Sequence, residues 1–163
     1  MALSYGVPLE KIQEAVKAFQ AVEHRIEFVR DLQGVLYYND SKATNPDAAI
    51  RGIGSMNRKT LLIGGGYDKN LEFDAWIESF DGKVKCLLLI GQTKDKIAVC
   101  ARKHGFENIV CCDTLNEAVN ICYRLAKPGE AVLLSPACAS WGDFKDYTQR
   151  GELFRQYVME LPE

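Results

Sequence analysis

Short apolar runs alternate with segments of helical periodicity along most of this chain, and this alternation constrains the fold more than any other feature. The apolar runs are residues 35–38, 60–63, 84–90, 108–112 and 131–134. Helical segments are expected at residues 46–53, 73–80, 94–103, 115–125 and 147–159. Short, mostly apolar runs of this kind are typical of parallel strands that helices cover on both sides. The sequence therefore predicts a Rossmann-like α/β domain, with a mostly parallel sheet flanked by helices.

An N-terminal helix and a β-hairpin are expected before this alternating region. Residues 8–19 repeat apolar side chains at a helical spacing, and Pro8 suits the first turn of a helix. Residues 25–29 alternate between polar and apolar, and residues 31–34 have the chemistry of a turn. The apolar run at 35–38 is then the second arm of the hairpin.

Length and charge limit the class of protein. The 163 residues, 47% of them hydrophobic, suit one domain with a full core, so a single domain spanning residues 1–163 is expected. The 20 basic and 22 acidic residues include no basic block, which argues against a nucleic-acid partner. No apolar run approaches the ~20 residues that cross a bilayer, so no membrane partner is expected. The N-terminus lacks the pattern of an export signal, and we expect a cytoplasmic protein.

The cysteines are expected to be buried free thiols. Four of the six lie in apolar segments: Cys86, Cys111, Cys112 and Cys122. None forms a CxxC pair or a zinc-like set with His24 or His104, so no metal site is predicted. A redox role for the adjacent Cys111 and Cys112 is an alternative, but a strand that holds two cysteines is the simpler explanation.

Three polar turns follow predicted strands, at the edge where ligands collect in open parallel sheets. The first turn, residues 40–45, reads Asp-Ser-Lys-Ala-Thr-Asn and leads into a helix that Asn45 caps and Pro46 begins. Its ammonium and hydroxyl groups lie where helix N–H groups already favour an anion. The alternative is a set of turn formers that bond their own backbone, with Lys42 as a surface charge.

The second turn, residues 64–70, begins with three glycines and contains Lys69. It matches neither GxxxxGK[ST] nor GxGxxG, so it is not a complete phosphate loop for a nucleotide. Exposed glycine N–H groups beside a lysine would form an anion site, whereas the alternative is a tight exit from a buried strand. The presence of Lys69 favours the anion site.

The third turn, residues 135–144, is rich in small residues and contains Ser135 and Ser140. Neither serine lies in a GxSxG elbow, and no histidine accompanies them, so no nucleophile is predicted. Ser140 is expected to contact a ligand, to cap a helix, or to do both. Arg150, near the start of the last helix, is interpreted either as part of this site or as a surface charge.

Together these stretches resemble the C-terminal domain of the Mur ligases, the ATP-dependent amide-forming enzymes of peptidoglycan precursor synthesis. The resemblance rests on His-Arg-Ile-Glu at 24–27, Asn-Asp-Ser-Lys-Ala-Thr-Asn at 39–45, Gly-Gly-Gly-Tyr-Asp-Lys at 64–69, Leu-Ser-Pro-Ala-Cys-Ala-Ser at 134–140, Phe144, and Gln-Arg-Gly at 149–151. It covers about residues 6–158. The turn at 39–45 is similar to that of the family branch that adds D-glutamate.

The resemblance implies a reaction and its ligands. In the family, ATP phosphorylates the carboxylate of UDP-N-acetylmuramoyl-L-alanine, and the amine of D-glutamate attacks the acyl phosphate. By this likeness, D-glutamate would be bound by Lys42, Thr44, Lys69, Ser140 and Tyr147. ATP would be contacted by Arg25 at the phosphates and by Asp40 at the ribose. Mg²⁺ and most of ATP would be bound by a central domain, so no catalytic residue or metal ligand is expected here. Two lysines with hydroxyl groups also suit a dicarboxylate on chemical grounds.

The resemblance also implies missing parts. The family's N-terminal UDP-binding domain and central ATPase domain are not in this sequence, so we expect an excised C-terminal domain that has no ligase activity alone. Two alternatives stay open. One is a stand-alone binding module for an acidic metabolite or a nucleotide. The other is a folylpolyglutamate synthetase-like domain, against which the turn at 40–45 argues.

Overall fold

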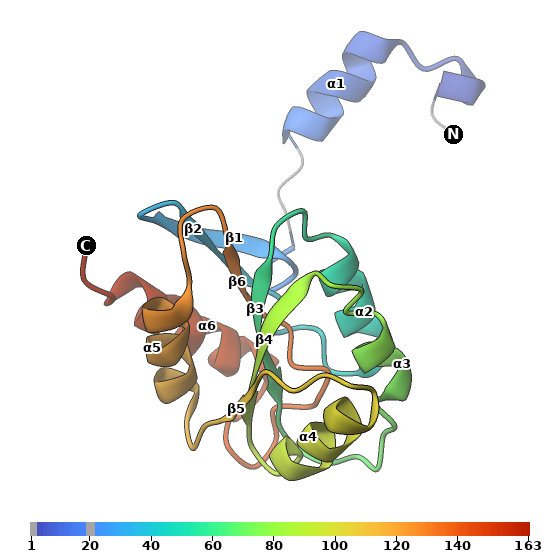
Figure 1. Ribbon diagram of the computed structural model, residues 1–163. Coiled ribbons are helices and arrows are strands. Elements are labelled where there is room, and N and C mark those ends of the chain that lie inside the picture. Colours follow the sequence, from blue (N-terminus) through green and yellow to red (C-terminus); the bar gives the residue numbers. More distant parts are fainter. Residues whose placement is uncertain (1–2, 19–21) are drawn as a thin grey trace.

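The computed structural model describes residues 3–18 and 22–163. Within these ranges the chain forms a six-stranded sheet in the order β1-β2-β6-β3-β4-β5, in which β1 is antiparallel to β2 and the other neighbours are parallel. The strands are β1 (Glu27–Leu32), β2 (Val35–Asn39), β3 (Thr60–Gly65), β4 (Val84–Ile90), β5 (Ile109–Cys111) and β6 (Ala131–Leu134). The prediction of a mostly parallel α/β sheet is confirmed (Figure 1).

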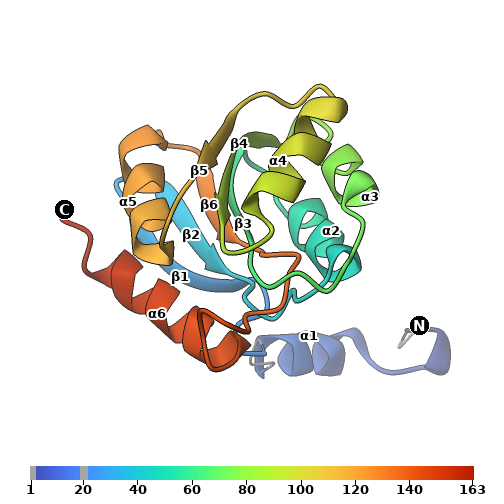
Figure 2. The same cartoon turned by 90° about the horizontal axis from the view of Figure 1, so that it is seen from below.

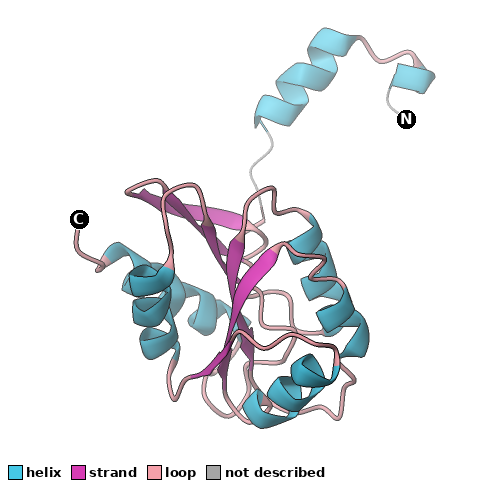
Figure 3. Cartoon of the chain, in the orientation of Figure 1, coloured by secondary structure: helices cyan, strands magenta, loops and turns pink. Residues whose placement is uncertain are grey.

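Helices cover both faces of the sheet (Figure 3). The helices are η1 (Leu3–Tyr5), α1 (Leu9–Ala18), α2 (Pro46–Gly54), α3 (Asp74–Glu78), α4 (Lys94–Lys103), α5 (Leu115–Leu125) and α6 (Tyr147–Met159). Figure 2 shows α2, α3 and α4 on one face and α5 and α6 on the other. Two buried clusters fill these interfaces, one around Trp76 and the other around Phe154. No helix in the described residues is both long and apolar enough to cross a bilayer.

The N-terminal helix and the hairpin differ in detail from the prediction. The predicted helix is α1, which lies apart from the sheet in Figure 1, and Phe19 lies outside the described residues. The hairpin is confirmed, and Asp31 Oδ1 accepts from Gly34 N–H at 2.9 Å, as the turn chemistry of residues 31–34 suggests. The turn is shorter than this range, because β1 continues to Leu32. Only Gln33 and Gly34 connect the strands, and both have positive φ angles, of 53° and 83°, as a tight hairpin turn requires.

Strand order brings the three polar turns together. Because β2, β6 and β3 are parallel neighbours, their carboxyl ends meet at one edge of the sheet. Gly65 N–H donates to the carbonyl of Pro136 at 2.8 Å, which joins the second turn to the third. The predicted cap of α2 is confirmed, since Asn45 Oδ1 accepts from Ala48 N–H at 3.0 Å and Pro46 is the first helical residue.

All six cysteines are free thiols, and most follow the prediction. Cys86, Cys112, Cys122 and Cys138 are buried, and Cys100 is half-buried. Cys111 is exposed, so its predicted burial was wrong. The reason is that β5 is a short strand at the sheet edge, where one of two adjacent side chains points away from the core.

Candidate functional site

The three turns and the start of α6 enclose a pocket of ≈ 180 Å³. Its lining residues are Thr44, Lys69, Ala139, Ser140, Trp141, Asp146 and Tyr147. Four of the five residues predicted to bind D-glutamate are therefore in one pocket. The fifth, Lys42, lies beside it, with Nζ 5.7 Å from the centroid of the Tyr147 ring. The structure brings these residues together, while their ligand remains a prediction.

The hydroxyl groups of Thr44 and Ser140 in the pocket are available to a ligand. Ser140 is only 4% exposed and Thr44 is half-buried. Neither hydroxyl has a hydrogen-bond partner among the described residues. The alternative role of Ser140 as a helix cap was wrong, because Asp146 caps α6 and accepts from Gln149 N–H at 2.8 Å. Hydroxyl groups without partners at a pocket wall suit a polar ligand.

Two pocket residues were missed by the sequence analysis. Trp141 is 53% exposed, and Lys69 Nζ lies 4.2 Å from the centroid of its ring, a cation–π contact. The Tyr67 ring packs against the same indole, with centroids 5.7 Å apart. Asp146 had a sequence signal, since an aspartate directly before a helical segment is a typical cap. Trp141 had no such signal, because the residues around a tryptophan in a loop do not show that it will contact a lysine distant in sequence.

The glycine turn does not present exposed N–H groups to a ligand. Gly66 N–H donates to Thr93 Oγ1 at 3.0 Å, and Tyr67 N–H donates to the carbonyl of Ala139 at 2.9 Å. A Cβ atom on Gly65 would lie 2.2 Å from the carbonyl oxygen of Ile90. The predicted anion site of glycine N–H groups was therefore wrong, and these glycines allow close packing of the backbone. The cation of this turn, Lys69, is nevertheless exposed beside the pocket.

Arg150 holds the first and third turns together from inside. Its side chain is fully buried, so its interpretation as a surface charge was wrong. Its Nε–H donates to Ser41 Oγ at 3.0 Å, and its NH2 group donates to the carbonyl of Ser41 at 2.8 Å. A third bond joins NH1 to the carbonyl of Cys138 at 3.1 Å. Burial lowers the pKa of Arg150 to about 10.

We call the hydrogen bonds from Arg150 to Ser41 and Cys138 the Arg150 clamp, and Ser41 extends it. Its hydroxyl donates to the carbonyl of Tyr147 at 2.8 Å, which attaches the first turn to α6. The alternative, that the side chains of this turn bond only the backbone of the turn itself, was therefore wrong for Ser41. It was also wrong for Asp40, whose Oδ2 accepts from Ser135 Oγ at 2.7 Å. Both contacts join parts of the chain that are far apart in sequence.

The two residues predicted to reach ATP lie outside the pocket lining. Asp40 is 4% exposed, and burial raises its pKa to about 6 against the opposing effects of the Ser135 hydrogen bond and Arg25. Arg25 is exposed. The preceding His24 is buried against Gly151, where its ring would lie 2.3 Å from an added Cβ atom. The imidazole therefore packs between strand and helix and does not face solvent.

A larger cavity of ≈ 270 Å³ lies between the ends of β4 and α5. Its lining includes Asp113 and Asp143 but no lysine or arginine. An acidic ligand is disfavoured there by charge. The smaller pocket, with Lys69 in its wall and Lys42 beside it, is the better site for a carboxylate.

A family model described as Mur ligase, glutamate ligase domain, matches residues 24–138. The chain belongs to this family. It is 57% identical over 161 residues to the UDP-N-acetylmuramoylalanine--D-glutamate ligase of Lachnoclostridium phytofermentans, a match that covers 99% of this chain and 36% of the relative. This member of the Mur ligase family thus spans about a third of the length of the curated relatives it matches.

Solved structures show the same fold at low sequence identity. The UDP-N-acetylmuramate-alanine ligase of Thermotoga maritima has a TM-score of 0.64 at 14% identity, over 97% of this chain and 35% of that structure. A folylpolyglutamate synthase of Thermotoga maritima has a TM-score of 0.60 at 14% identity, over 94% of this chain and 34% of that structure. Because both kinds of enzyme share the fold, the fold alone does not distinguish them.

Proposed function

We propose that this domain binds D-glutamate for an ATP-dependent Mur ligase that joins it to UDP-N-acetylmuramoyl-L-alanine in peptidoglycan synthesis. The observation that carries the proposal is the pocket in which Thr44, Lys69 and Ser140 meet from three separate turns. The lysine ammonium groups would balance the two carboxylates of the ligand, and the hydroxyls would fix its orientation. Relatives named as D-glutamate ligases, at 45–57% identity, support this amino acid over the folylpolyglutamate alternative.

The role of the domain would be to position the amine of D-glutamate. Asp146 contributes a carboxylate to the same pocket, opposite in charge to the ammonium group of an amino acid. Lys69 Nζ lies 4.2 Å from the centroid of the Trp141 ring, and this cation–π contact positions the ammonium group at the pocket. Correct placement of two reactants supplies a large share of rate enhancement in ligation. We propose that the other reactants are bound mainly by domains outside this chain.

ATP and Mg²⁺ are proposed ligands of the whole enzyme. The exposed guanidinium of Arg25 suits a phosphate. Asp40 fits a ribose poorly in this conformation, because its carboxylate is buried and already accepts from Ser135. The residues lining the pocket include a single carboxylate, Asp146, which caps α6. Mg²⁺ needs more oxygen ligands than these residues offer, so the ion belongs elsewhere in the enzyme.

The test is a titration of the isotopically labelled chain with D-glutamate and L-glutamate, followed by NMR of the backbone amides. D-glutamate should bind weakly and shift the signals of Thr44, Lys69 and Ser140. Lys69→Met should weaken binding about tenfold or more, because one charged hydrogen bond is worth roughly 1.5–3 kcal/mol. Lys127→Met is the control, because this exposed lysine precedes β6 at the opposite edge of the sheet.

Other outcomes would favour the alternatives. Equal binding of L-glutamate would support a folylpolyglutamate synthetase-like domain. Tight binding of a nucleotide or another acid, without any partner, would support a stand-alone module. The chain alone should not convert UDP-N-acetylmuramoyl-L-alanine, ATP and D-glutamate to product. Measurable turnover would refute the proposal that the other two reactants are bound mainly by domains outside this chain.

A further inference from the structure

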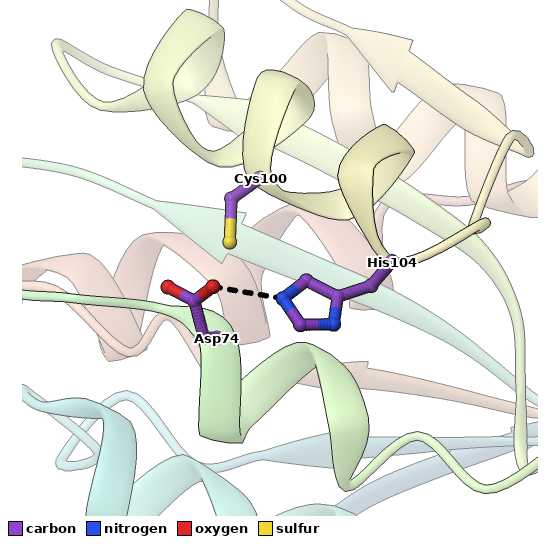
Figure 4. Close-up of side chains that lie close together, drawn as sticks. All are labelled: Asp74, Cys100 and His104. Carbon is purple, nitrogen blue, oxygen red and sulfur yellow. Dashed lines mark hydrogen bonds and ion pairs between the residues drawn. The ribbon is translucent and has the colours of Figure 1, made fainter.

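Three metal-ligating side chains converge between α3 and α4, away from the pocket. Asp74 is the first residue of α3, and Cys100 and His104 lie four residues apart at the C-terminal end of α4. Figure 4 shows the thiol and the imidazole pointing from α4 toward the carboxylate on α3. One ligand atom of each residue lies within 4.8 Å of the other two, and His104 Nε2 is 2.8 Å from Asp74 Oδ1.

The donor set selects the metal. A thiolate, an imidazole and a carboxylate together suit Zn²⁺, whereas Mg²⁺ and Ca²⁺ prefer oxygen ligands alone. Three protein ligands leave the fourth tetrahedral position for water. A cavity of ≈ 200 Å³ is lined by both Asp74 and Cys100, so the open side of the cluster has room for that water.

Neighbouring side chains orient the imidazole for this role. His104 Nδ1 lies 3.6 Å from Glu78 Oε1, and a carboxylate at one ring nitrogen is the usual partner of a histidine that ligates metal through the other. Nε2 is then directed at Asp74 and Cys100. Lys103 Nζ competes for Asp74 Oδ1 at 3.2 Å, but its side chain is 73% exposed and is free to turn into solvent.

We propose that Asp74, Cys100 and His104 bind one Zn²⁺, which joins α3 to α4. Asp74 directly follows the segment at residues 64–73 that carries Lys69, so the ion would also fix the end of that segment. No metal site was predicted from the sequence, because Asp74 is far from Cys100 and His104 along the chain and no CxxC pair is present. The spacing of Cys100 and His104 on a helix was the available signal, since residues four apart share a helix face.

The test uses the whole chain with Co²⁺ as a spectroscopic substitute for Zn²⁺, in the presence of a reductant that does not bind metal. The wild-type chain should develop a sulfur-to-cobalt charge-transfer band that Zn²⁺ removes by displacement. Cys100→Ser should lose the band, and His104→Gln should weaken Co²⁺ binding at least tenfold. Glu78→Gln, which keeps all three ligands, should weaken binding about tenfold through the lost orientation.

Cys111→Ser is the matched control, because Cys111 is the exposed thiol on β5. This variant should keep the band and the affinity of the wild type. Far-UV circular dichroism of each variant checks that it is folded. A wild-type chain without a charge-transfer band at millimolar Co²⁺, or a Cys100→Ser chain that keeps the band, would overturn the proposal.

Discussion

Replacing Arg150 with methionine is the sharpest test of how the site is held together. The guanidinium makes three hydrogen bonds, to the hydroxyl and carbonyl of Ser41 and to the carbonyl of Cys138. Among the described residues, no carboxylate forms a salt bridge with it, so these oxygens alone compensate its buried charge. Methionine has a similar length and no donor. The substitution therefore removes the clamp while it preserves most of the packed volume.

The expected loss of stability follows from two opposing terms. A hydrogen bond to a charged group contributes about 1.5–3 kcal/mol, so three of them contribute roughly 5–9 kcal/mol together. Burial lowers the pKa of Arg150 from 12.5 to about 10, which corresponds to a cost of about 3 kcal/mol that methionine does not carry. We expect Arg150→Met to reduce the free energy of unfolding by about 2–6 kcal/mol.

Urea unfolding followed by circular dichroism measures this loss as a shift in midpoint at constant slope. Arg150→Lys should lose an intermediate amount, because it keeps the charge but not the planar fork of donors. Arg124→Met, at an exposed position in the last turn of α5, is the control and should change stability by about 1 kcal/mol or less. A loss below about 1 kcal/mol for Arg150→Met would refute the clamp.

Two further predictions concern the buried carboxylate under the first turn. Because burial raises the pKa of Asp40 from 3.8 to about 6, the folded protein favours its protonated form, and the resulting stability, present below pH 4, is lost as the pH rises through 6. The loss should be about 3 kcal/mol, and urea midpoints of Asp40→Asn should vary less between pH 4 and 7; an identical pH profile would contradict the assignment. Gly52→Ala should destabilise by about 1–3 kcal/mol, since its Cβ would lie 2.5 Å from Asp40 Oδ2. Gly54→Ala, with open space in the same helix, should instead stabilise by about 0.5–1 kcal/mol, and thermal melts in which both variants shift alike would rule out the steric account.

Local features could be predicted from the sequence because local physics decides them. β3 is apolar after Thr60 and buried throughout, and Asn45 with Pro46 begins α2 as expected. The length of the hairpin turn was harder to predict. Residues 31–34 could all form the turn, or residues 31 and 32 could end a strand and leave a two-residue turn. Pairing between β1 and β2 selects the second arrangement.

The sequence by itself determined the fold class, the three turns and the lysines and hydroxyls that they carry, since apolar periodicity and turn chemistry act over a few residues. Only the tertiary structure decided what those turns do. The parallel order of β2, β6 and β3 brings Ser41 and Tyr147 together across 106 residues of sequence. The same strand order buries Arg150, and it pairs the Gly66 N–H group of the second turn with Thr93 Oγ1 inside the protein. Such contacts depend on strand order, which no local pattern specifies.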